Sequence, residues 1–224
     1  MRLRWRLGKV IAYILVKPFI RFRVIGQDNI QKNTAQILAA NHRSHMDPAL
    51  VALASTQEIY FMAKEELFHI SKFFKWLISF WNAIPLPRGA GASEALKKCS
   101  SLLAQGKTVL IFPEGTRNKF EDLLLPFKPG FGFLAVANQV PIIPVAITGV
   151  REAWNGKLSQ FIDKDIKQKT KSEKVKGKNN KEITVRFGKP VFPDGKIKNR
   201  GEYEQIAQTV KNDIELLLKE SYAA

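Results

Sequence analysis

The sequence contains a single cysteine, Cys99, among its 224 residues. An internal disulfide framework is therefore excluded, and this cysteine usage fits a reducing compartment. Acidic residues are also scarce: 20 aspartates and glutamates stand against 36 lysines and arginines, which gives a formal net charge of +16 at pH 7. This excess indicates an anionic partner, namely membrane lipid, nucleic acid, or a phosphorylated or acidic substrate.

Long apolar runs are missing as well. No stretch reaches the roughly 18 residues that a transmembrane helix requires, and the early apolar run at 10–16 ends at Lys17-Pro18. The N-terminus has no small-residue cleavage site, so a secretory signal is not expected. Apolar residues nevertheless make up 45% of the chain, which is enough for one well-packed domain.

Residues 1–22 have the pattern of a basic amphipathic helix. The apolar residues that recur at helical spacing are Leu3, Leu7, Val10, Ile11, Ile14 and Leu15. The basic residues on the opposite side are Arg2, Arg6, Lys9 and Lys17. Such a helix can lie in a bilayer interface with its basic groups toward lipid phosphates, and Trp5 among the arginines favours this interpretation. The alternative is an ordinary helix that packs on its own domain.

Short apolar runs then alternate with helical patterns over residues 23–224. The expected strands are 23–26, 36–40, 59–63, 83–86, 108–112, 142–147 and 183–187. The expected helices are 48–55, 71–81, 92–104, 130–138 and 202–219. This alternation predicts a single α/β domain with a mixed, mostly parallel sheet flanked by helices. Cys99 falls on the apolar stripe of the helix at 92–104, which indicates a core residue and not a nucleophile.

A lysine-rich stretch at 157–181 differs from the rest, because it has few apolar residues. We interpret it as a surface insertion, either a solvated loop or a contact for an acidic partner. The aromatic residues at 73–81 also have two interpretations, an additional interface contact or core packing.

The segment from His42 to Asp47 follows the apolar run at 37–40 directly. Asp47 before Pro48 is typical of a helix start, with aspartate at the N-cap and proline at the first helical position, and this alone explains Asp47. The same loop can also fold His42 back toward the carboxylate. The imidazole would then be oriented through one ring nitrogen and accept a proton at the other. His45 in the same loop is the rival base.

A second segment, at 112–117, follows the apolar strand pattern at 109–112. Proline ends the ladder, Gly115 permits a tight turn, and Arg117 presents a two-pronged donor. Ligands of α/β sheets gather beyond the carboxyl ends of strands, where an arginine suits a phosphate. The alternative is a turn with a structural Glu114–Arg117 pair.

Two further basic residues follow predicted strands. Arg88 comes after the strand at 83–86 and is a second candidate phosphate ligand, and Lys64 comes after the strand at 59–63. An isolated basic residue after a strand has many explanations, so the sequence supports a binding role for these two residues less strongly than it does for Arg117.

Taken together, these segments resemble the glycerolipid acyltransferase family. Residues 41–47 are similar to its NHxSxxD block, with the histidine and aspartate in HX4D spacing, and residues 112–117 match its FPEGTR block letter for letter. Residues 127–130 resemble its FKxG segment and residues 140–145 its VPIIPV block. Order and spacing agree from about residue 20 to 150, and the chain most resembles the bacterial 1-acylglycerol-3-phosphate acyltransferases. It departs from the family where Asn82 and Pro87 replace the usual glycine and aspartate near the arginine block.

The resemblance implies a glycerol-3-phosphate acyltransferase-like fold and a chemical role for each site residue. His42 would be the general base on the sn-2 hydroxyl of lysophosphatidic acid, and Asp47 would orient it. Lys64, or a backbone N–H near the turn at 112–117, would stabilise the oxyanion. The acceptor phosphate would be held by Arg88 and Arg117, in a pocket shaped by Glu114, Gly115 and Thr116.

The resemblance also implies the partners. The donor would be acyl-CoA or acyl carrier protein, both anionic, and the product phosphatidic acid, with no metal ion and no cofactor involved. The enzyme would be peripheral or monotopic on the cytoplasmic face of the cell membrane, bound to its anionic surface. One alternative is a relative that acts on glycerol 3-phosphate or another lysolipid. A more distant one is a basic nucleic-acid-binding protein, which the charge suggests but no binding motif supports.

Overall fold

The computed structural model describes residues 3–16, 18, 21–87, 89, 91–118, 124–150, 182–194 and 199–223. Its strands form one sheet in the order β1-β7-β6-β2-β5-β3-β4. The strands are β1 (Arg21–Ile25), β2 (Gln36–Ala40), β3 (Ile59–Lys64), β4 (Ala83–Leu86), β5 (Thr108–Ile111), β6 (Ile142–Thr148) and β7 (Glu182–Phe187). The five strands from β6 to β4 are parallel, whereas β7 is antiparallel to β6, and β1 is parallel to β7. The predicted α/β fold with a mixed, mostly parallel sheet is confirmed.

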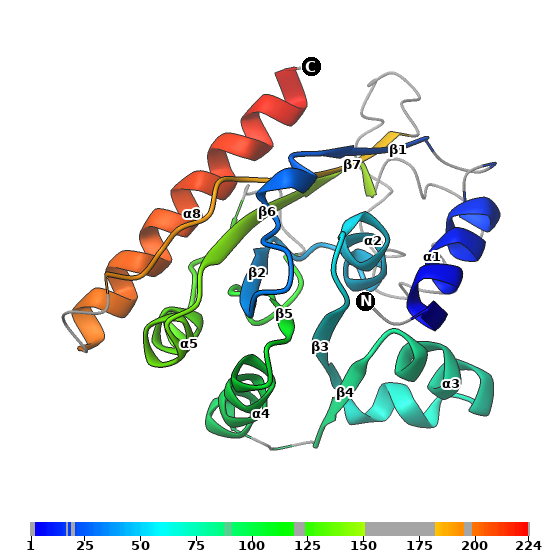
Figure 1. Cartoon of the computed structure of the whole chain (residues 1–224), viewed down its shortest axis with the longest axis horizontal. Coiled ribbons are helices and arrows are strands. Elements are labelled where there is room, and N and C mark those ends of the chain that lie inside the picture. Colours follow the sequence, from blue (N-terminus) through cyan, green and yellow to red (C-terminus); the bar gives the residue numbers. More distant parts are fainter. Residues whose placement is uncertain are drawn as a thin grey trace, which may run out of the picture.

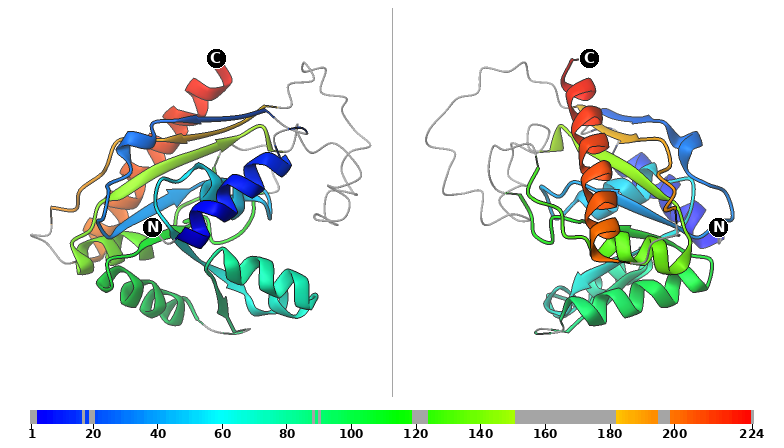
Figure 2. Two further views of the ribbon diagram at one scale, coloured as in Figure 1. Left: turned by 45° about the vertical axis from the view of Figure 1, so that its right-hand side comes forward. Right: turned by 90° about the vertical axis from the view of Figure 1, so that its left-hand side faces the viewer.

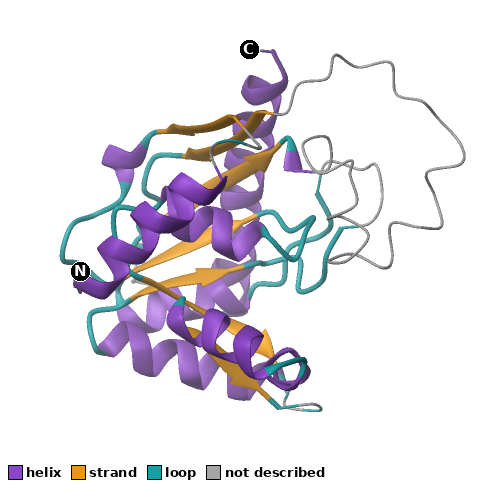
Figure 3. Cartoon of the chain, turned by 90° about the vertical axis from the view of Figure 1, so that its right-hand side faces the viewer, coloured by secondary structure: helices purple, strands orange, loops and turns teal. Residues whose placement is uncertain are grey.

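Helices cover both faces of this sheet (Figures 1 and 2). On one face lie α4 (Ala92–Ala104), α5 (Gly130–Asn138) and α8 (Arg200–Ala223). On the other lie α1 (Leu3–Val16), α2 (Asp47–Ala54) and α3 (Lys72–Phe80), which face the viewer in Figure 3. Two short 3₁₀ helices, Gln27–Asn29 and Glu65–His69, complete the described elements.

The sheet divides the core into two clusters. The strands β2 and β6 are buried along their whole length, and apart from Gln36 and Thr148 at their ends they have continuous apolar sequences and not alternating ones. One cluster joins the sheet to α1 and α2, and the other joins it to α4, α5 and α8. Cys99 lies in the second cluster, where burial raises the pKa of its thiol to about 11. The prediction that Cys99 is a core residue is confirmed.

The helix α1 has two apolar faces. On the inner face Trp5 is only 1% exposed and meets Trp81 edge to face, with ring centroids 5.0 Å apart. One turn further, Gly8 leaves no room for a Cβ beside the ring of Phe80. The outer face consists of Leu3, Leu7, Val10, Ile11 and Ile14, each more than half exposed. The helix therefore packs on its own domain and also presents an apolar stripe to solvent.

Two predictions about α1 are wrong in detail. Trp5 is not an interfacial anchor, because its indole fills the core between α1 and α3. Lys9 is not directed at lipid phosphates: its Nζ donates a hydrogen bond to the carbonyl of Ser55, the C-cap of α2. Burial lowers the pKa of Lys9 to about 8. A positive charge at this end of α2 complements the helix dipole.

Among the described residues, no helix combines the length and the apolar character needed to cross a membrane. The lysine-rich stretch at 157–181 lies outside the described residues. Its interpretation as a surface insertion stays a prediction, as does the division into a helix at 1–22 and a domain at 23–224.

The two faces of α1 make different contributions to stability. Trp5→Ala should lower the free energy of unfolding by about 3–5 kcal/mol, because it leaves a cavity against Trp81. Leu7→Ala, on the outer face, should change it by no more than about 0.5 kcal/mol. Urea denaturation of the two variants checks this pair. Equal losses would contradict the assignment of an inner and an outer face.

Candidate active site

The candidate site is formed by two loops at one edge of the sheet. Strands β2 and β5 are adjacent and parallel, in a register from Gln36 opposite Thr108 to Ala39 opposite Ile111. Their carboxyl ends therefore meet at the same edge, which is where ligands gather in parallel sheets. The loop after β2 contains His42, and the loop after β5 contains the segment 112–117.

His42 and Asp47 form the predicted pair. The His42 Nδ1 and Asp47 Oδ2 atoms are 2.9 Å apart, and the carboxylate is 1% exposed. The same oxygen accepts hydrogen bonds from the backbone N–H groups of Arg43 and Ser44, at 2.6 and 2.7 Å. The other oxygen, Oδ1, is buried without a hydrogen-bond partner among the described residues. All contacts of the carboxylate thus converge on the oxygen that faces the imidazole.

The predicted N-cap role of Asp47 is wrong. The helix α2 begins at Asp47 itself, and the N-cap residue is Met46, whose side chain makes no capping hydrogen bond. The carboxylate turns back to the loop at 43–44 instead of accepting from the next turn of the helix. Asp47 therefore fixes the loop that contains His42, and its acidic charge in the first turn still suits the helix dipole.

The rival base, His45, occupies a different environment. Its side chain is exposed, whereas the His42 imidazole keeps only 18% of its surface exposed. His42 also stacks on Phe112, with ring centroids 4.0 Å apart and an interplanar angle of 23°. The ring of His42 is thus held by stacking of one face on Phe112 and by the contact of Nδ1 with Asp47.

The loop after β5 holds the backbone of His42 from both sides. The His42 N–H donates to Glu114 Oε1 at 2.7 Å, and the Asn118 N–H donates to the His42 carbonyl at 2.7 Å. Glu114 is buried, and its second oxygen accepts from the Leu125 N–H at 3.0 Å. Burial raises the pKa of Glu114, while the hydrogen bonds from His42 and Leu125 act in the opposite direction.

The turn at 112–117 is closed by a hydrogen bond from the Gly115 N–H to the Phe112 carbonyl at 3.0 Å. Gly115 has φ +68°, a left-handed conformation that glycine adopts without strain. A Cβ at this position would lie 2.7 Å from Lys128 Nζ, so the lysine side chain packs over the turn. The Lys128 N–H also donates to the Pro113 carbonyl at 3.0 Å.

The remaining predicted residues are placed as follows. Gly115 and Thr116 are exposed, and Arg117 is half-buried in the same loop. Lys64 is exposed at the end of β3, at the same edge of the sheet but separated from β2 by β5. Arg88 lies outside the described residues. The structure thus places Asp47 against the ring of His42 and Glu114 against its backbone N–H, and Gly115, Thr116 and Arg117 follow Glu114 in the same turn.

Four residues of the site were not assigned a role from sequence. Phe112 and Asn118 hold His42, and Lys128 covers the turn. Asn41 extends β2 by exchanging hydrogen bonds with the backbone of Ile147, at 2.8 and 3.0 Å. The blocks at 41–47, 112–117 and 127–130 contain three of these residues, so the resemblance pointed to them without giving their contacts.

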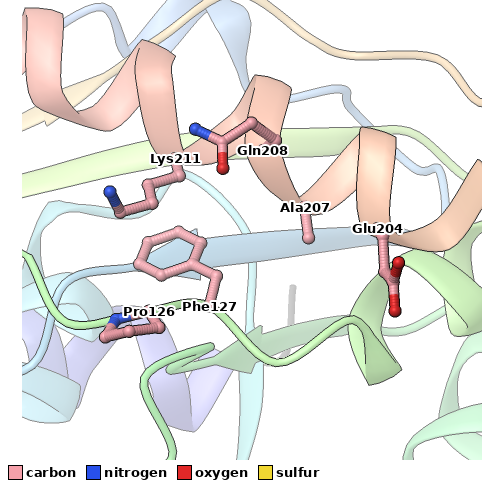
Figure 4. A pocket seen from close by; sticks show the side chains of 6 residues that line it. All are labelled: Pro126, Phe127, Glu204, Ala207, Gln208 and Lys211. Carbon is pink, nitrogen blue, oxygen red and sulfur yellow. The ribbon is translucent and has the colours of Figure 1, made fainter. Parts of the chain in front are cut away.

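A separate pocket lies between α8 and residues 126–127 (Figure 4). Its lining residues are Pro126, Phe127, Glu204, Ala207, Gln208 and Lys211. None of them belongs to the predicted site, and the Lys211 ammonium is already paired with Glu215. The chemistry predicted from the sequence is therefore not located in this pocket.

Comparison with known proteins identifies the family. The profile of the family described as Acyltransferase matches residues 21–148, more than half of the chain. The chain belongs to the Acyltransferase family. The matched range includes His42, Asp47, the turn at 112–117 and Lys128.

Similar curated proteins come from plants and bacteria. The chain is 32% identical over 146 residues to the chloroplastic 1-acyl-sn-glycerol-3-phosphate acyltransferase BAT2 of Brassica napus, which covers 64% of this chain and 42% of that protein. It is 30% identical over 131 residues to the 1-acyl-sn-glycerol-3-phosphate acyltransferase of Bacillus subtilis. This match covers 57% of this chain and 62% of that protein. The match spans less than two thirds of each of these relatives.

A solved structure extends the similarity to the whole chain. The 1-acyl-sn-glycerophosphate acyltransferase PlsC of Thermotoga maritima matches with a TM-score of 0.66 and 26% identity. The match covers 100% of this chain and 85% of that one. The resemblance to glycerolipid acyltransferases is thus confirmed for both sequence and fold.

The Asp47 carboxylate should stabilise the fold as well as the site. Asp47→Asn preserves the shape of the side chain but replaces one oxygen by an amide donor and removes the charge. We expect a loss of about 1–3 kcal/mol in the free energy of unfolding, because the buried N–H groups of Arg43 and Ser44 lose a charged acceptor. Asp28→Asn, at an exposed aspartate, is the matched control and should change little. Indistinguishable denaturation curves for the two variants would contradict this role.

Proposed function

We propose that this protein transfers an acyl group from an acyl thioester to the sn-2 hydroxyl of lysophosphatidic acid and so forms phosphatidic acid. The observation that supports this most directly is the 2.9 Å contact between His42 Nδ1 and Asp47 Oδ2 beside the turn at 112–117. The similarity to proteins named 1-acyl-sn-glycerol-3-phosphate acyltransferase points to the same acceptor.

The first step is removal of the hydroxyl proton. An ionised carboxylate only accepts hydrogen bonds, so Asp47 selects the tautomer in which Nδ1 is protonated and Nε2 is the basic nitrogen. Nε2 takes the proton of the acceptor hydroxyl as its oxygen attacks the thioester carbonyl. Asp47 stabilises the imidazolium that results.

The second step is collapse of the tetrahedral intermediate. The carbon–sulfur bond breaks, the ester carbonyl reforms, and the imidazolium returns its proton to the departing thiolate. No acyl-enzyme is needed, and Cys99 lies in the core on the α4 side of the sheet. Lys64, or a backbone N–H of the turn at 112–117, is proposed to stabilise the oxyanion.

The acceptor phosphate is proposed to bind at the turn after β5. Arg117 supplies a planar two-pronged donor and Thr116 a hydroxyl, while Gly115 leaves room for the Lys128 side chain above the turn. Lys128 Nζ adds a second positive charge above Gly115. Arg88, outside the described residues, is proposed as a further ligand of this phosphate.

The membrane is proposed to bind the outer face of α1. The exposed stripe of Leu3, Leu7, Val10, Ile11 and Ile14 has exposed arginines Arg4 and Arg6 in the same helix. Apolar residues entering the bilayer boundary and arginines near lipid phosphates are typical of an interfacial helix. Trp76, 60% exposed on α3, adds apolar surface and lies beside Phe80, whose ring packs against Gly8 of α1. The enzyme is thus proposed to lie on the cytoplasmic face of the membrane.

The donor is proposed to be acyl-CoA or acyl carrier protein. Both are anionic, and the net charge of +16 favours association with either. Assays of purified protein with lysophosphatidic acid and each donor test the activity. Glycerol 3-phosphate and a lysolipid without a free phosphate serve as alternative acceptors. Formation of phosphatidic acid from neither donor would contradict the proposal.

The two histidines of the loop should differ as bases. His42→Ala should lower kcat by about 100- to 10,000-fold, the usual contribution of a general base, while the protein stays folded. His45→Ala, at the exposed rival, should keep kcat within a few-fold of the wild-type value. The measurement is steady-state transfer to lysophosphatidic acid, with circular dichroism to check folding. An equal loss of kcat in the two variants would contradict the assignment of His42 as the base.

The outer face of α1 should bind vesicles without supporting the fold. Leu7→Ser with Ile14→Ser should weaken binding to anionic vesicles at least about tenfold, because two apolar side chains no longer enter the lipid. Leu216→Ser, at a similarly exposed leucine on α8, should bind like the wild type. Vesicle co-sedimentation measures this. Unchanged binding of the double variant would contradict the role of α1. Deletion of residues 1–20 would not test it, since Trp5 belongs to the core.

A further inference from the structure

Glu114 occupies an unexpected place for a residue of the acceptor pocket. Its side chain is 4% exposed, and both carboxylate oxygens accept backbone hydrogen bonds inside the protein. An ionised carboxylate placed against a lipid phosphate would also repel it. Neither its exposure nor its charge suits direct contact with the acceptor.

The partners of Glu114 connect three segments of the chain. Oε1 accepts from the N–H of His42 in the loop after β2, and Oε2 accepts from the N–H of Leu125. Leu125 precedes Lys128 by three residues, and Lys128 Nζ packs over Gly115. One buried carboxylate thus joins the backbone of the proposed base to the segment that covers the proposed phosphate site.

The remaining contacts of His42 show what this hydrogen bond fixes. Asn118 donates to the His42 carbonyl, Phe112 stacks on its ring, and Asp47 engages Nδ1. With Glu114 at the N–H, both polar groups of the His42 backbone, one ring face and one ring nitrogen are held. The position of Nε2 then depends on the Glu114 hydrogen bond as well as on Asp47.

We propose that Glu114 is a positioning residue that acts through the backbone of His42 and not on the acceptor. This inference rests on the proposed function, because it assigns Glu114 to the rate of the His42 step. Misplacement of a base by a fraction of an ångström lowers the rate without weakening acceptor binding. Loss of Glu114 should therefore lower kcat and leave the KM for lysophosphatidic acid nearly unchanged.

Two variants separate this role from a contact with the acceptor. Glu114→Gln keeps the shape of the side chain, but its NH2 group cannot accept a hydrogen bond, so one of the two backbone N–H groups loses its acceptor. Glu114→Ala removes both hydrogen bonds. We expect kcat to fall about tenfold to hundredfold in Glu114→Gln and further in Glu114→Ala, with KM within about twofold. Arg117→Ala, at the proposed phosphate ligand, should instead raise KM. Glu204→Gln, at an exposed glutamate of α8, is the control for loss of charge and should match the wild type.

A second measurement does not depend on activity. Amide hydrogen exchange at His42 and Leu125, followed by NMR, should be faster in Glu114→Gln for at least one of the two N–H groups and unchanged in Arg117→Ala. If Glu114→Ala does not fold, Glu114→Gln alone decides. A raised KM with unchanged kcat, or unchanged kinetics and unchanged exchange, would overturn the proposal. Absence of acyl transfer by the wild type would instead refute the proposed function, and the exchange data would still test the Glu114 contacts.

Discussion

The parallel pairing of β2 with β5 is the constraint on which the site depends. Its register aligns Ala39 with Ile111, so the loops that leave the two strands start side by side. The contacts between the two loops use this proximity: Glu114 and Asn118 reach the His42 backbone, and Phe112 reaches its ring. A shift of one residue in this pairing would turn every side chain of the shifted strand to the opposite face of the sheet. Backbone pairing of β2 with β5 thus brings the two motifs together.

The fold was largely predictable from sequence because its signals are local. Continuous apolar runs mark the buried strands, and stripes such as that of α4 mark the helices. The His42–Asp47 pair was also predictable, since five positions span one tight loop. Directions of side chains at element ends were not. Asp47 looked like an N-cap, but its carboxylate turns toward the N–H groups of Arg43 and Ser44 and toward the His42 ring.

The errors at α1 have a related cause. Periodicity identified one apolar stripe, and its exposure in the structure agrees with an interfacial helix. The opposite face contains Trp5, Gly8 and Ala12 together with Lys9, and so it resembled a basic polar face. Long-range partners make it a packing face. Trp5 packs against Trp81, and Gly8 packs against Phe80. Lys9 donates a hydrogen bond to the Ser55 carbonyl. No local pattern reveals partners so distant along the chain.

These contacts also relate the proposed membrane face to the proposed chemistry. Lys9 of α1 binds the carboxyl end of α2, and Asp47 forms the first residue of the same helix. Because α2 has only eight residues, a rigid element of about 12 Å joins the two ends. If a lipid surface binds the outer face of α1 as proposed, the Lys9 hydrogen bond would connect that surface to α2, and so to the Asp47 carboxylate beside His42. An acceptor in the same surface would meet a base whose orientation relative to the bilayer is set by the fold itself.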